Sequence, residues 1–276
     1  MEKGVTFHSG GKTYHLEAVR MNPCVLTAGS PGRIRKLIHY LDGAESFEGG
    51  RGLVVVHGLY KNTPVSGVTT GMGPASTSIV LPEVIELIQG DGVLLRIGTA
   101  GSLQDHVLPG HAVVASASIR DEDTTHALVG PEYPALSSPE MLPFLLSALE
   151  KQGFLLDKSL WLGVVHTKSD LYFKEAPQFS PRKNELLERL KSYRRMGALA
   201  SEMELSSHFL LKDYYTSPRR RFMAGGILGI VANAPKSGRV IPEGEEGLED
   251  RLLLAGLEAI HKLWTTKTIK MSEWIH

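Results

Sequence analysis

The stretch GVLLRIGTAGSL, residues 92–103, has the pattern of a buried strand that ends in a glycine-rich turn. Its first half is an apolar run of valine, leucine and isoleucine, which is typical of a strand covered on both faces. Gly98 and Gly101 interrupt the second half. One charged residue, Arg96, lies inside the apolar run. The stretch therefore predicts both a core strand and a polar site at or near its end.

Strand and helix patterns alternate on both sides of this stretch. Strands are predicted at 23–29, 51–71 with a turn at 61–64, 110–122, 160–170 and 221–233. Helices are predicted at 30–41, 74–90, 137–153, 184–197 and 247–264, with Pro82 expected to kink the second of them or to displace its start. This alternation predicts one α/β domain over residues 1–276 with a mixed, largely parallel sheet. The segments 175–184 and 234–247 are rich in proline, glycine and charge, and we expect both to be surface loops.

The composition excludes several classes of function. Among 276 residues, 30 lysines and arginines balance 30 aspartates and glutamates. Sequence-independent binding to nucleic acid, or binding to an acidic membrane, would need an excess of basic residues. The single cysteine, Cys24, excludes an intramolecular disulfide and a cysteine metal cluster. The sequence shows no secretory signal and no apolar stretch of about 20 residues, so we expect a cytoplasmic protein.

Three polar residues point to an anion site. Arg96 inside an apolar strand needs either an internal carboxylate or a bound anion, because an unpaired buried charge costs several kcal/mol. Thr99 follows at the end of the same strand. Arg33 belongs to GSPGR (29–33), a strand-to-helix turn that starts with Gly29 and exposes backbone N–H groups. Arg33, Arg96 and Thr99 together could hold one tetrahedral anion, although Arg33 alone could also be an ordinary surface residue.

The glycine-rich segment TGMGPAST (70–77) does not fit a dinucleotide site. It nearly spells Gly-x-Gly-x-x-Gly, but Ser76 occupies the third glycine position. The next strand ends in Thr99 and glycines instead of the acid that would bind a ribose.

The segment LASEMELSSHF (199–209) places two acids, Glu202 and Glu204, around Met203 among apolar neighbours. Two acids at a helix start can satisfy backbone N–H groups. We expect this alternative to be open for Glu202 and not for Glu204.

Six motifs in this order resemble the nucleoside phosphorylase family, and most closely its uridine phosphorylase branch. They are FHSGGKTYHL (7–16), GSPGR (29–33), TTGMGPASTSI (69–79), LLRIGTAGSLQ (94–104), VHTKSDLYF (165–173) and SEMELSS (201–207). The resemblance covers nearly the whole chain. It implies a three-layer αβα fold with a mixed, partly barrel-like central sheet.

The resemblance also implies roles for the site residues. Gly29, Arg33, Arg96 and Thr99 would bind phosphate. Glu204 would accept hydrogen bonds from the ribose 2′- and 3′-hydroxyls, Met203 would pack on the sugar, and Glu202 would support them. Phosphate would serve as co-substrate, and no metal or organic cofactor would be required.

Family members complete the site from a neighbouring subunit, so the resemblance implies a homo-oligomer with a dimer as its minimal unit and a hexamer as an option. His8 would reach the sugar 5′-hydroxyl of the neighbour and Arg51 would add a third cation to its phosphate. The less favoured alternative is that Arg51 is a surface residue. Gly52 follows it where cation-binding relatives carry glutamate, so we expect no such ion.

The base-binding residues depart from the family pattern. Tyr172 lies in the segment that borders the base. The Gln-x-Arg motif that reads uracil is replaced by Gln178 and Arg182, which are four positions apart. Asn233 stands where purine-cleaving relatives carry an acid, and an amide is not a general acid. We therefore predict phosphorolysis of uridine, with a purine nucleoside phosphorylase as the alternative. A hydrolytic nucleosidase and a non-catalytic nucleoside-binding protein are less favoured alternatives.

Overall fold

The structure, a computed structural model, describes residues 8–9, 11–233 and 247–266. Its strands are β1 (His8–Ser9), β2 (Lys12–Thr13), β3 (Cys24–Ala28), β4 (Asp42–Glu48), β5 (Val54–Tyr60), β6 (Thr63–Thr69), β7 (Gly92–Ser102), β8 (Ala112–Asp121), β9 (Ala135–Leu136), β10 (Leu160–Lys168), β11 (Ala200–Glu202) and β12 (Phe222–Ala232). Its α-helices are α1 (Pro31–Arg35), α2 (Gly73–Leu87), α3 (Leu142–Lys151), α4 (Tyr172–Glu175), α5 (Lys183–Arg195), α6 (Leu205–Tyr215) and α8 (Leu248–Thr265).

The main sheet is mixed and closes on itself at one side. Its strand order is β11-β10-β8-β12-β7-β3-β6-β5-β4. β11 pairs with β10 and also with β7, so β11, β10, β8, β12 and β7 form a closed ring of five strands. The remaining strands extend from β7 as an open sheet. This arrangement confirms the predicted mixed and partly barrel-like sheet.

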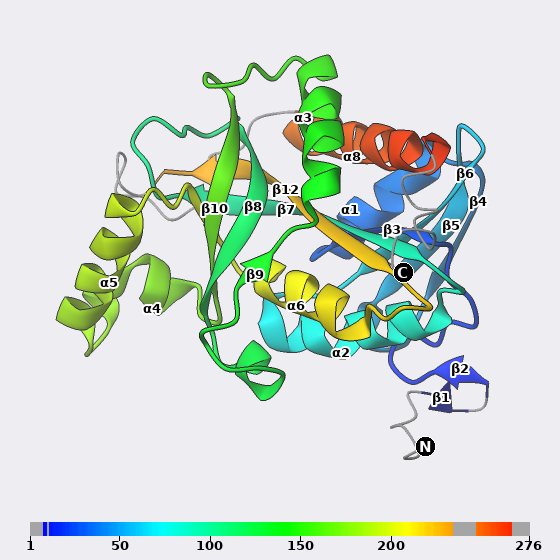
Figure 1. Cartoon of the computed structure of the whole chain (residues 1–276), viewed down its shortest axis with the longest axis horizontal. Coiled ribbons are helices and arrows are strands. Elements are labelled where there is room, and N and C mark those ends of the chain that lie inside the picture. The colour runs from blue at the N-terminus through cyan, green and yellow to red at the C-terminus, as the bar shows by residue number, and fades with distance from the viewer. Residues whose placement is uncertain (1–7, 10, 234–246, 267–276) are drawn as a thin grey trace.

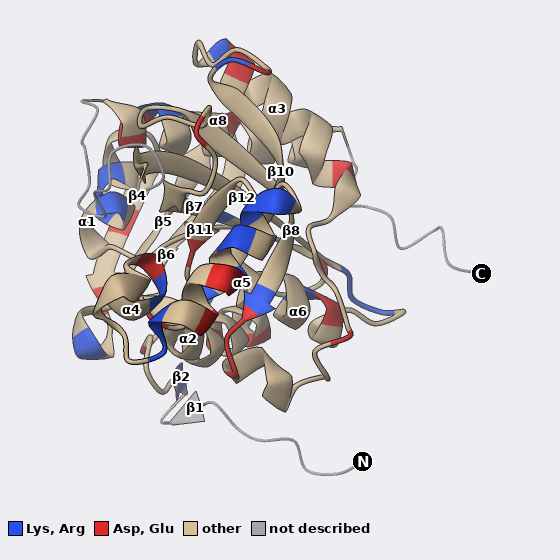
Figure 2. Cartoon of the chain, turned by 90° about the vertical axis from the view of Figure 1, so that its left-hand side faces the viewer, with Lys and Arg blue, Asp and Glu red and all other residues tan. Residues whose placement is uncertain are grey.

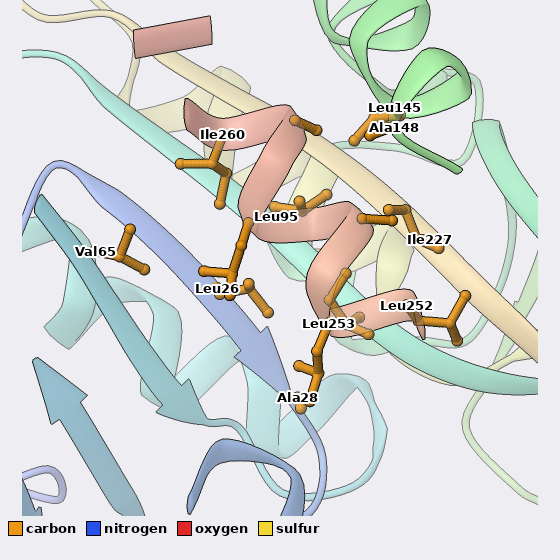
Figure 3. Close-up of a cluster of buried hydrophobic side chains, with 14 of the residues drawn as sticks. Leu26, Ala28, Val65, Leu95, Leu145, Ala148, Ile227, Leu252, Leu253 and Ile260 are labelled. Carbon is orange, nitrogen blue, oxygen red and sulfur yellow. The ribbon is translucent and has the colours of Figure 1, made fainter. Parts of the chain in front are cut away.

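Helices cover both faces of the sheet (Figure 1). One core packs α8 and α3 against strand residues such as Leu26, Leu95 and Ile227 (Figure 3). The other core packs α2 and α6 against the opposite face, around residues such as Phe209 and Val25. Burial of each of these large apolar side chains contributes roughly 1.5–3 kcal/mol. The three-layer αβα prediction is therefore confirmed.

The predicted strands and helices recur with two instructive differences. The turn expected at 61–64 is a two-residue hairpin loop, because Lys61 and Asn62 both have positive φ, at 49° and 65°. Helix α2 starts at Gly73 and continues through Pro82, so Pro82 does not displace its start. Among the described residues, no helix has both the length and the apolar character that crossing a membrane requires. The predicted loop at 234–247 falls, up to residue 246, outside the described residues.

The ring brings the carboxyl ends of two sets of strands together. β3, β6 and β12 run parallel to each other or to β7, whereas β10 and β11 run the other way. The antiparallel pair Gly101–Ser201 joins the two sets near their ends. Ligands in open α/β sheets bind outside the carboxyl ends of the strands, so this junction is the place to look for a site.

Candidate active site

A cavity of about 520 Å³ lies at this junction. Its volume falls within the range of small-molecule sites, roughly 300–1,000 Å³. Its walls come from the turns after β3 and β6 and from the ends of β7, β10, β11 and β12. The lining residues are Gly29, Ser30, Pro31, Arg33, Gly71, Met72, Arg96, Thr99, Ala100, Gly101, Lys168, Leu171, Glu175, Ser201, Glu202, Met203, Glu204, Val231 and Ala232.

Arg96 is buried at 4% exposure and faces two carboxylates. Its Nη2 donates to Oε2 of Glu204, and its Nε lies 3.5 Å from Oε2 of Glu202. The internal carboxylate considered as one alternative is therefore present. Nε and Nη1 of Arg96 still have no hydrogen-bond partner among the described residues. The side chain lies over Gly98, where a Cβ would come 3.2 Å from Nε and Nη2. Glycine at 98 therefore gives the guanidinium room.

Glu204 links the start of α2 to Arg96. Its Oε1 accepts the N–H of Gly73, the first residue of α2, at 2.7 Å. The carboxylate is 4% exposed. It thus satisfies a backbone N–H, but in a different helix from its own, while its other oxygen is bound to Arg96.

Glu202 has the helix-start role considered from the sequence. Its carboxylate accepts the N–H groups of Glu204, at 2.7 Å, and of Leu205, at 3.0 Å, and the hydroxyl of Thr167. Leu205 is the first residue of α6. Burial, and then the charge of Glu204, raise the pKa of Glu202. Glu202 therefore holds the start of α6 and the backbone of Glu204 in place.

The turn after β3 supplies the second arginine of the cavity. Ser30 precedes helix α1 as its N-cap residue, although its side chain makes no capping hydrogen bond. Arg33 is 8% exposed. Its Nη2 lies 2.6 Å from Oε1 of Glu249 in α8, and its Nη1 donates to the carbonyl of Ile97 at 3.2 Å. These contacts fix the guanidinium beside β7, two residues before Thr99.

The structure brings seven predicted residues to this one cavity: Gly29, Arg33, Arg96, Thr99, Glu202, Met203 and Glu204. It does not bring the predicted base-binding residues there. Tyr172 is 69% exposed and Gln178 is exposed. Arg182 is paired on the surface with Glu185, with Nε 3.0 Å from Oε2. Asn233 is buried beside the cavity wall, and its amide donates to the carbonyls of Gln104 and Val107.

Arg51, one of the two residues expected to act across a subunit boundary, is not among the residues that line the cavity. Arg51 is exposed and has a left-handed backbone conformation, with φ of 60°. His8 belongs to β1, where it pairs with Thr13 of β2.

Lys168, Glu175 and Ser201 line the cavity but escaped the sequence interpretation. Lys168 is 1% exposed, and its Nζ donates to Oγ of Ser201 at 2.6 Å and lies 2.8 Å from Oε2 of Glu175. The available signal was a lysine at the end of the apolar strand 160–168, analogous to Arg96 in β7. The partner Glu175 lies in α4, in a segment whose composition predicts a loop.

Comparison with known proteins agrees with this geometry. The chain matches the family model of the phosphorylase superfamily over residues 23–211. A uridine phosphorylase of Treponema pallidum (strain Nichols) is 28% identical over 254 residues, with 91% of this chain and 94% of the relative covered. A guanosine phosphorylase of Halorubrum lacusprofundi is 27% identical over 205 residues, with 74% and 76% covered.

Among solved structures, a uridine phosphorylase from Vibrio fischeri ES114, complexed with 6-hydroxy-1-naphthoic acid, has the same fold. Its TM-score is 0.70 at 24% identity, with 88% of this chain and 92% of that chain covered. The superfamily model spans more than half of the chain and includes most of the strands and turns that line the cavity. The protein therefore belongs to the phosphorylase superfamily.

Proposed function

We propose that this protein is a nucleoside phosphorylase that converts uridine and inorganic phosphate to uracil and ribose 1-phosphate. A phosphate oxygen forms a bond to C1′ of the ribose while the bond from C1′ to the base nitrogen breaks. The bonding electron pair leaves with the base, which then takes a proton. Membership of the phosphorylase superfamily and the relatives named uridine phosphorylase support this assignment.

One observation carries the proposal: a buried arginine and a buried carboxylate, Arg96 and Glu204, lie in contact in the wall of one cavity. Phosphorolysis needs a cation for the phosphate next to an anion for the sugar. The sugar becomes positively charged in the transition state, and a fixed carboxylate and the phosphate itself both stabilise that charge.

The phosphate end is assigned to Gly29, Arg33, Arg96 and Thr99. Nε and Nη1 of Arg96 lack hydrogen-bond partners among the described residues, and phosphate oxygens are suitable acceptors for them. The ribose end is assigned to Met203 and Glu204, with Glu202 holding the backbone of Glu204. With these assignments the phosphate and C1′ would lie within reach of each other, and the reaction would need no metal or organic cofactor.

Uridine is preferred over purine nucleosides because of the residue at position 233. Cleavage of a purine nucleoside at neutral pH benefits from an acid that protonates the ring, and the amide of Asn233 cannot do so. A purine nucleoside phosphorylase is the second candidate, since one relative is a guanosine phosphorylase. Hydrolysis is disfavoured because a water-using enzyme has no need of Arg33 and Arg96 in the same cavity.

We further propose that residues 1–276 form one domain of a cytoplasmic homo-oligomer with a dimer as its smallest unit. The exposure of Arg51, away from the cavity of its own chain, supports a role in a neighbouring cavity. His8 is assigned the same kind of role toward the sugar. Tyr172, Gln178 and Arg182 can contact the base of a bound nucleoside only if their segment moves toward the cavity.

A panel of nucleosides tests the proposal. Purified protein is incubated with uridine, thymidine, inosine, guanosine, cytidine or adenosine, with and without phosphate, and free base is measured by chromatography. We expect phosphate-dependent release of uracil and formation of ribose 1-phosphate. Release of base at the same rate without phosphate would identify a hydrolase, and faster cleavage of inosine than of uridine would favour the purine candidate.

A further inference from the structure

The group formed by Lys168, Glu175 and Ser201 has no role in the phosphate or ribose assignments above. Lys168 is the last residue of β10, Ser201 is the middle residue of β11, and Glu175 is the last residue of α4. The Lys168 and Glu175 side chains are 1% and 7% exposed, and all three residues line the cavity. Burying a lysine and a glutamate costs desolvation free energy, so we looked for a function that needs both charges in the cavity wall.

The geometry leaves both charged groups able to contact a ligand. The ammonium of Lys168 has three N–H donors; it donates one hydrogen bond to Ser201 and lies 2.8 Å from Oε2 of Glu175 as an ion pair. Oε2 of Glu175 is buried and has no hydrogen-bond partner among the described residues, so it can still accept a hydrogen bond. Glu175 binds Lys168 through Oε2, and its Oε1 lies over Gly101. A Cβ at position 101 would come 2.5 Å from this oxygen, so glycine at 101 is what permits the carboxylate to lie there.

The group lies toward the end of the cavity away from Arg33. Arg33 is fixed to the carbonyl of Ile97 in β7, whereas Glu175 lies over Gly101, four residues further along the same strand. At about 3.3 Å per residue, these positions are roughly 13 Å apart along β7. Ser201 pairs with Gly101, so it belongs to the same end. With phosphate near Arg33 and Arg96 and ribose near Glu204, the remaining part of a nucleoside, its base, falls at the end of Lys168 and Glu175.

We infer that Lys168 and Glu175 bind the base of the nucleoside and restrict it to bases that have a carbonyl group beside a ring N–H. This inference rests on the proposed function. Lys168 donates to the carbonyl oxygen, and Glu175 accepts from the neighbouring ring N–H. Uracil, thymine, hypoxanthine and guanine present this pair. Cytosine and adenine, in the same orientation, present an amino donor to Lys168 and an unprotonated nitrogen to Glu175, which leaves both charges unpaired.

Lys168 also acts on the bond that breaks. The electron pair of the C1′–N bond passes to the base, and in uracil the resulting charge spreads onto the carbonyl oxygens. An ammonium in a buried wall stabilises that charge more strongly than it stabilises the neutral substrate, because the local dielectric is low. The base then takes its proton from water, and Lys168 keeps its own.

The test compares Lys168→Met with the wild type and with Lys191→Met. Lys191 is an exposed lysine of α5, paired with Glu188 at 2.6 Å, and its variant should keep wild-type activity. We expect Lys168→Met to lower kcat/KM for uridine about 100-fold, the effect of one lost charged hydrogen bond. The KM for phosphate should change by less than about threefold, since the phosphate end is untouched.

Two readouts separate contact with the base from a purely structural role. First, the loss should be several-fold smaller with 5-fluorouridine, because fluorine stabilises the leaving anion and reduces the need for Lys168. Second, Lys168→Arg should recover part of the activity toward uridine. If Lys168→Met fails to fold, the variant Lys168→Met/Glu175→Gln, which removes both charges, takes its place.

The outcomes distinguish the inference from the proposed function. Suppose that the wild type cleaves uridine. The inference alone is overturned if Lys168→Met keeps full activity, or if it loses as much activity on 5-fluorouridine as on uridine. Comparable kcat/KM for uridine and cytidine in the wild type also overturns it. If the wild type cleaves no nucleoside, the proposed function fails, and calorimetric binding of uracil then decides the inference. Binding that Lys168→Met weakens upholds it, and binding that is absent or unchanged overturns it.

Discussion

The two ends of the cavity are built from different kinds of sequence. At the proposed phosphate end, β3 and β6 lead into turns that contain glycine, and β7 carries Gly98 and Gly101 near its own end. Arg33 and Arg96 are held there by carboxylates of the core or its edge. At the proposed base end, the part of the cavity around Lys168 and Glu175, β10 leads into the short helix α4 and the wall depends on this one charged pair. Helices α4 and α5 lie together at one side of the molecule, where acidic and basic residues alternate (Figure 2). The first end is made from strands of the sheet. The second depends on the segment that contains α4 and α5, called the covering segment below, which carries many charges.

The largest expected effect concerns the pair at the centre of the phosphate end. Arg96→Met removes the cation that faces Glu204 and Glu202, and both carboxylates stay buried. Breaking a buried pair in this way should cost on the order of 3–5 kcal/mol in the free energy of unfolding, besides abolishing phosphorolysis. Chemical denaturation followed by circular dichroism measures the first effect, and the phosphate-dependent assay measures the second.

Glu204→Gln is the second single variant of a double-mutant cycle with Arg96→Met. Its amide oxygen can still accept the N–H of Gly73, so stability should fall less than in Arg96→Met. Turnover should fall about 100-fold, since roughly 2–4 kcal/mol of transition-state stabilisation is lost. The double variant Arg96→Met/Glu204→Gln should be more stable than the sum of the single changes predicts. Additive effects would mean that the two side chains do not interact.

An exposed pair supplies the control for this cycle. Arg20 and Glu45 are 2.9 Å apart, with side chains 64% and 70% exposed. Arg20→Met should change stability by less than about 1 kcal/mol, because water screens such pairs.

The same contrast explains which parts of the molecule could be predicted from the sequence. The phosphate end could be predicted from the sequence because its signals are local. Arg96 in an apolar strand and glycines at the strand end are visible in a dozen residues. The pairing of Arg96 with Glu204 could not be predicted, because it joins positions 108 apart along the chain.

The residues of the base end were harder to predict from the sequence, for a physical reason. Gln178 and Arg182 were expected there because a family motif lies nearby, but they belong to an exposed segment whose shape depends on long-range contacts. The strand β4 was missed for a related reason: as the edge of the sheet it is mostly exposed and lacks an apolar alternation. β11 has only three residues, yet it closes the ring, and its closure depends on pairing with β7.

A smaller effect is expected from Asp121, which ties the covering helices to the sheet. Asp121 is the last residue of β8; its Oδ1 lies 2.9 Å from Arg189 of α5 and 3.0 Å from Lys174 of α4, and its Oδ2 lies 3.0 Å from His166. Burial favours a higher pKa for this carboxyl, but hydrogen bonds from His166 and Lys174 outweigh it and lower the pKa of Asp121 to about 2. The ionised form is therefore favoured in the folded protein.

The sign of the pH dependence follows from this pKa. In the unfolded chain an aspartate has a pKa of about 3.9, so the stabilisation is complete above that pH and is lost as the pH falls towards 2. Asp121→Asn should cost about 2 kcal/mol at pH 7 and progressively less below pH 4. It should also raise the KM for the nucleoside more than the KM for phosphate. Asp105→Asn, which alters an exposed pair with Arg194 at 3.0 Å, should show neither effect.

The smallest expected effects are those of Arg182 and Gln178, and they decide where the base is read. Arg182 already binds Glu185 on the surface, and its side chain is 66% exposed. To reach a base in the cavity it would have to leave this pair and move with its segment, at a cost that binding must repay. The Lys168–Glu175 pair lies in the cavity wall and needs no such movement. We therefore expect Arg182→Ala and Gln178→Ala to change kcat/KM for uridine by less than about threefold, compared with about 100-fold for Lys168→Met. Steady-state kinetics on all three variants, with uridine at saturating phosphate, measures the difference. A loss in Gln178→Ala that equals the loss in Lys168→Met would show that the covering segment closes over the base, and the base end would then be formed only in the complex with substrate.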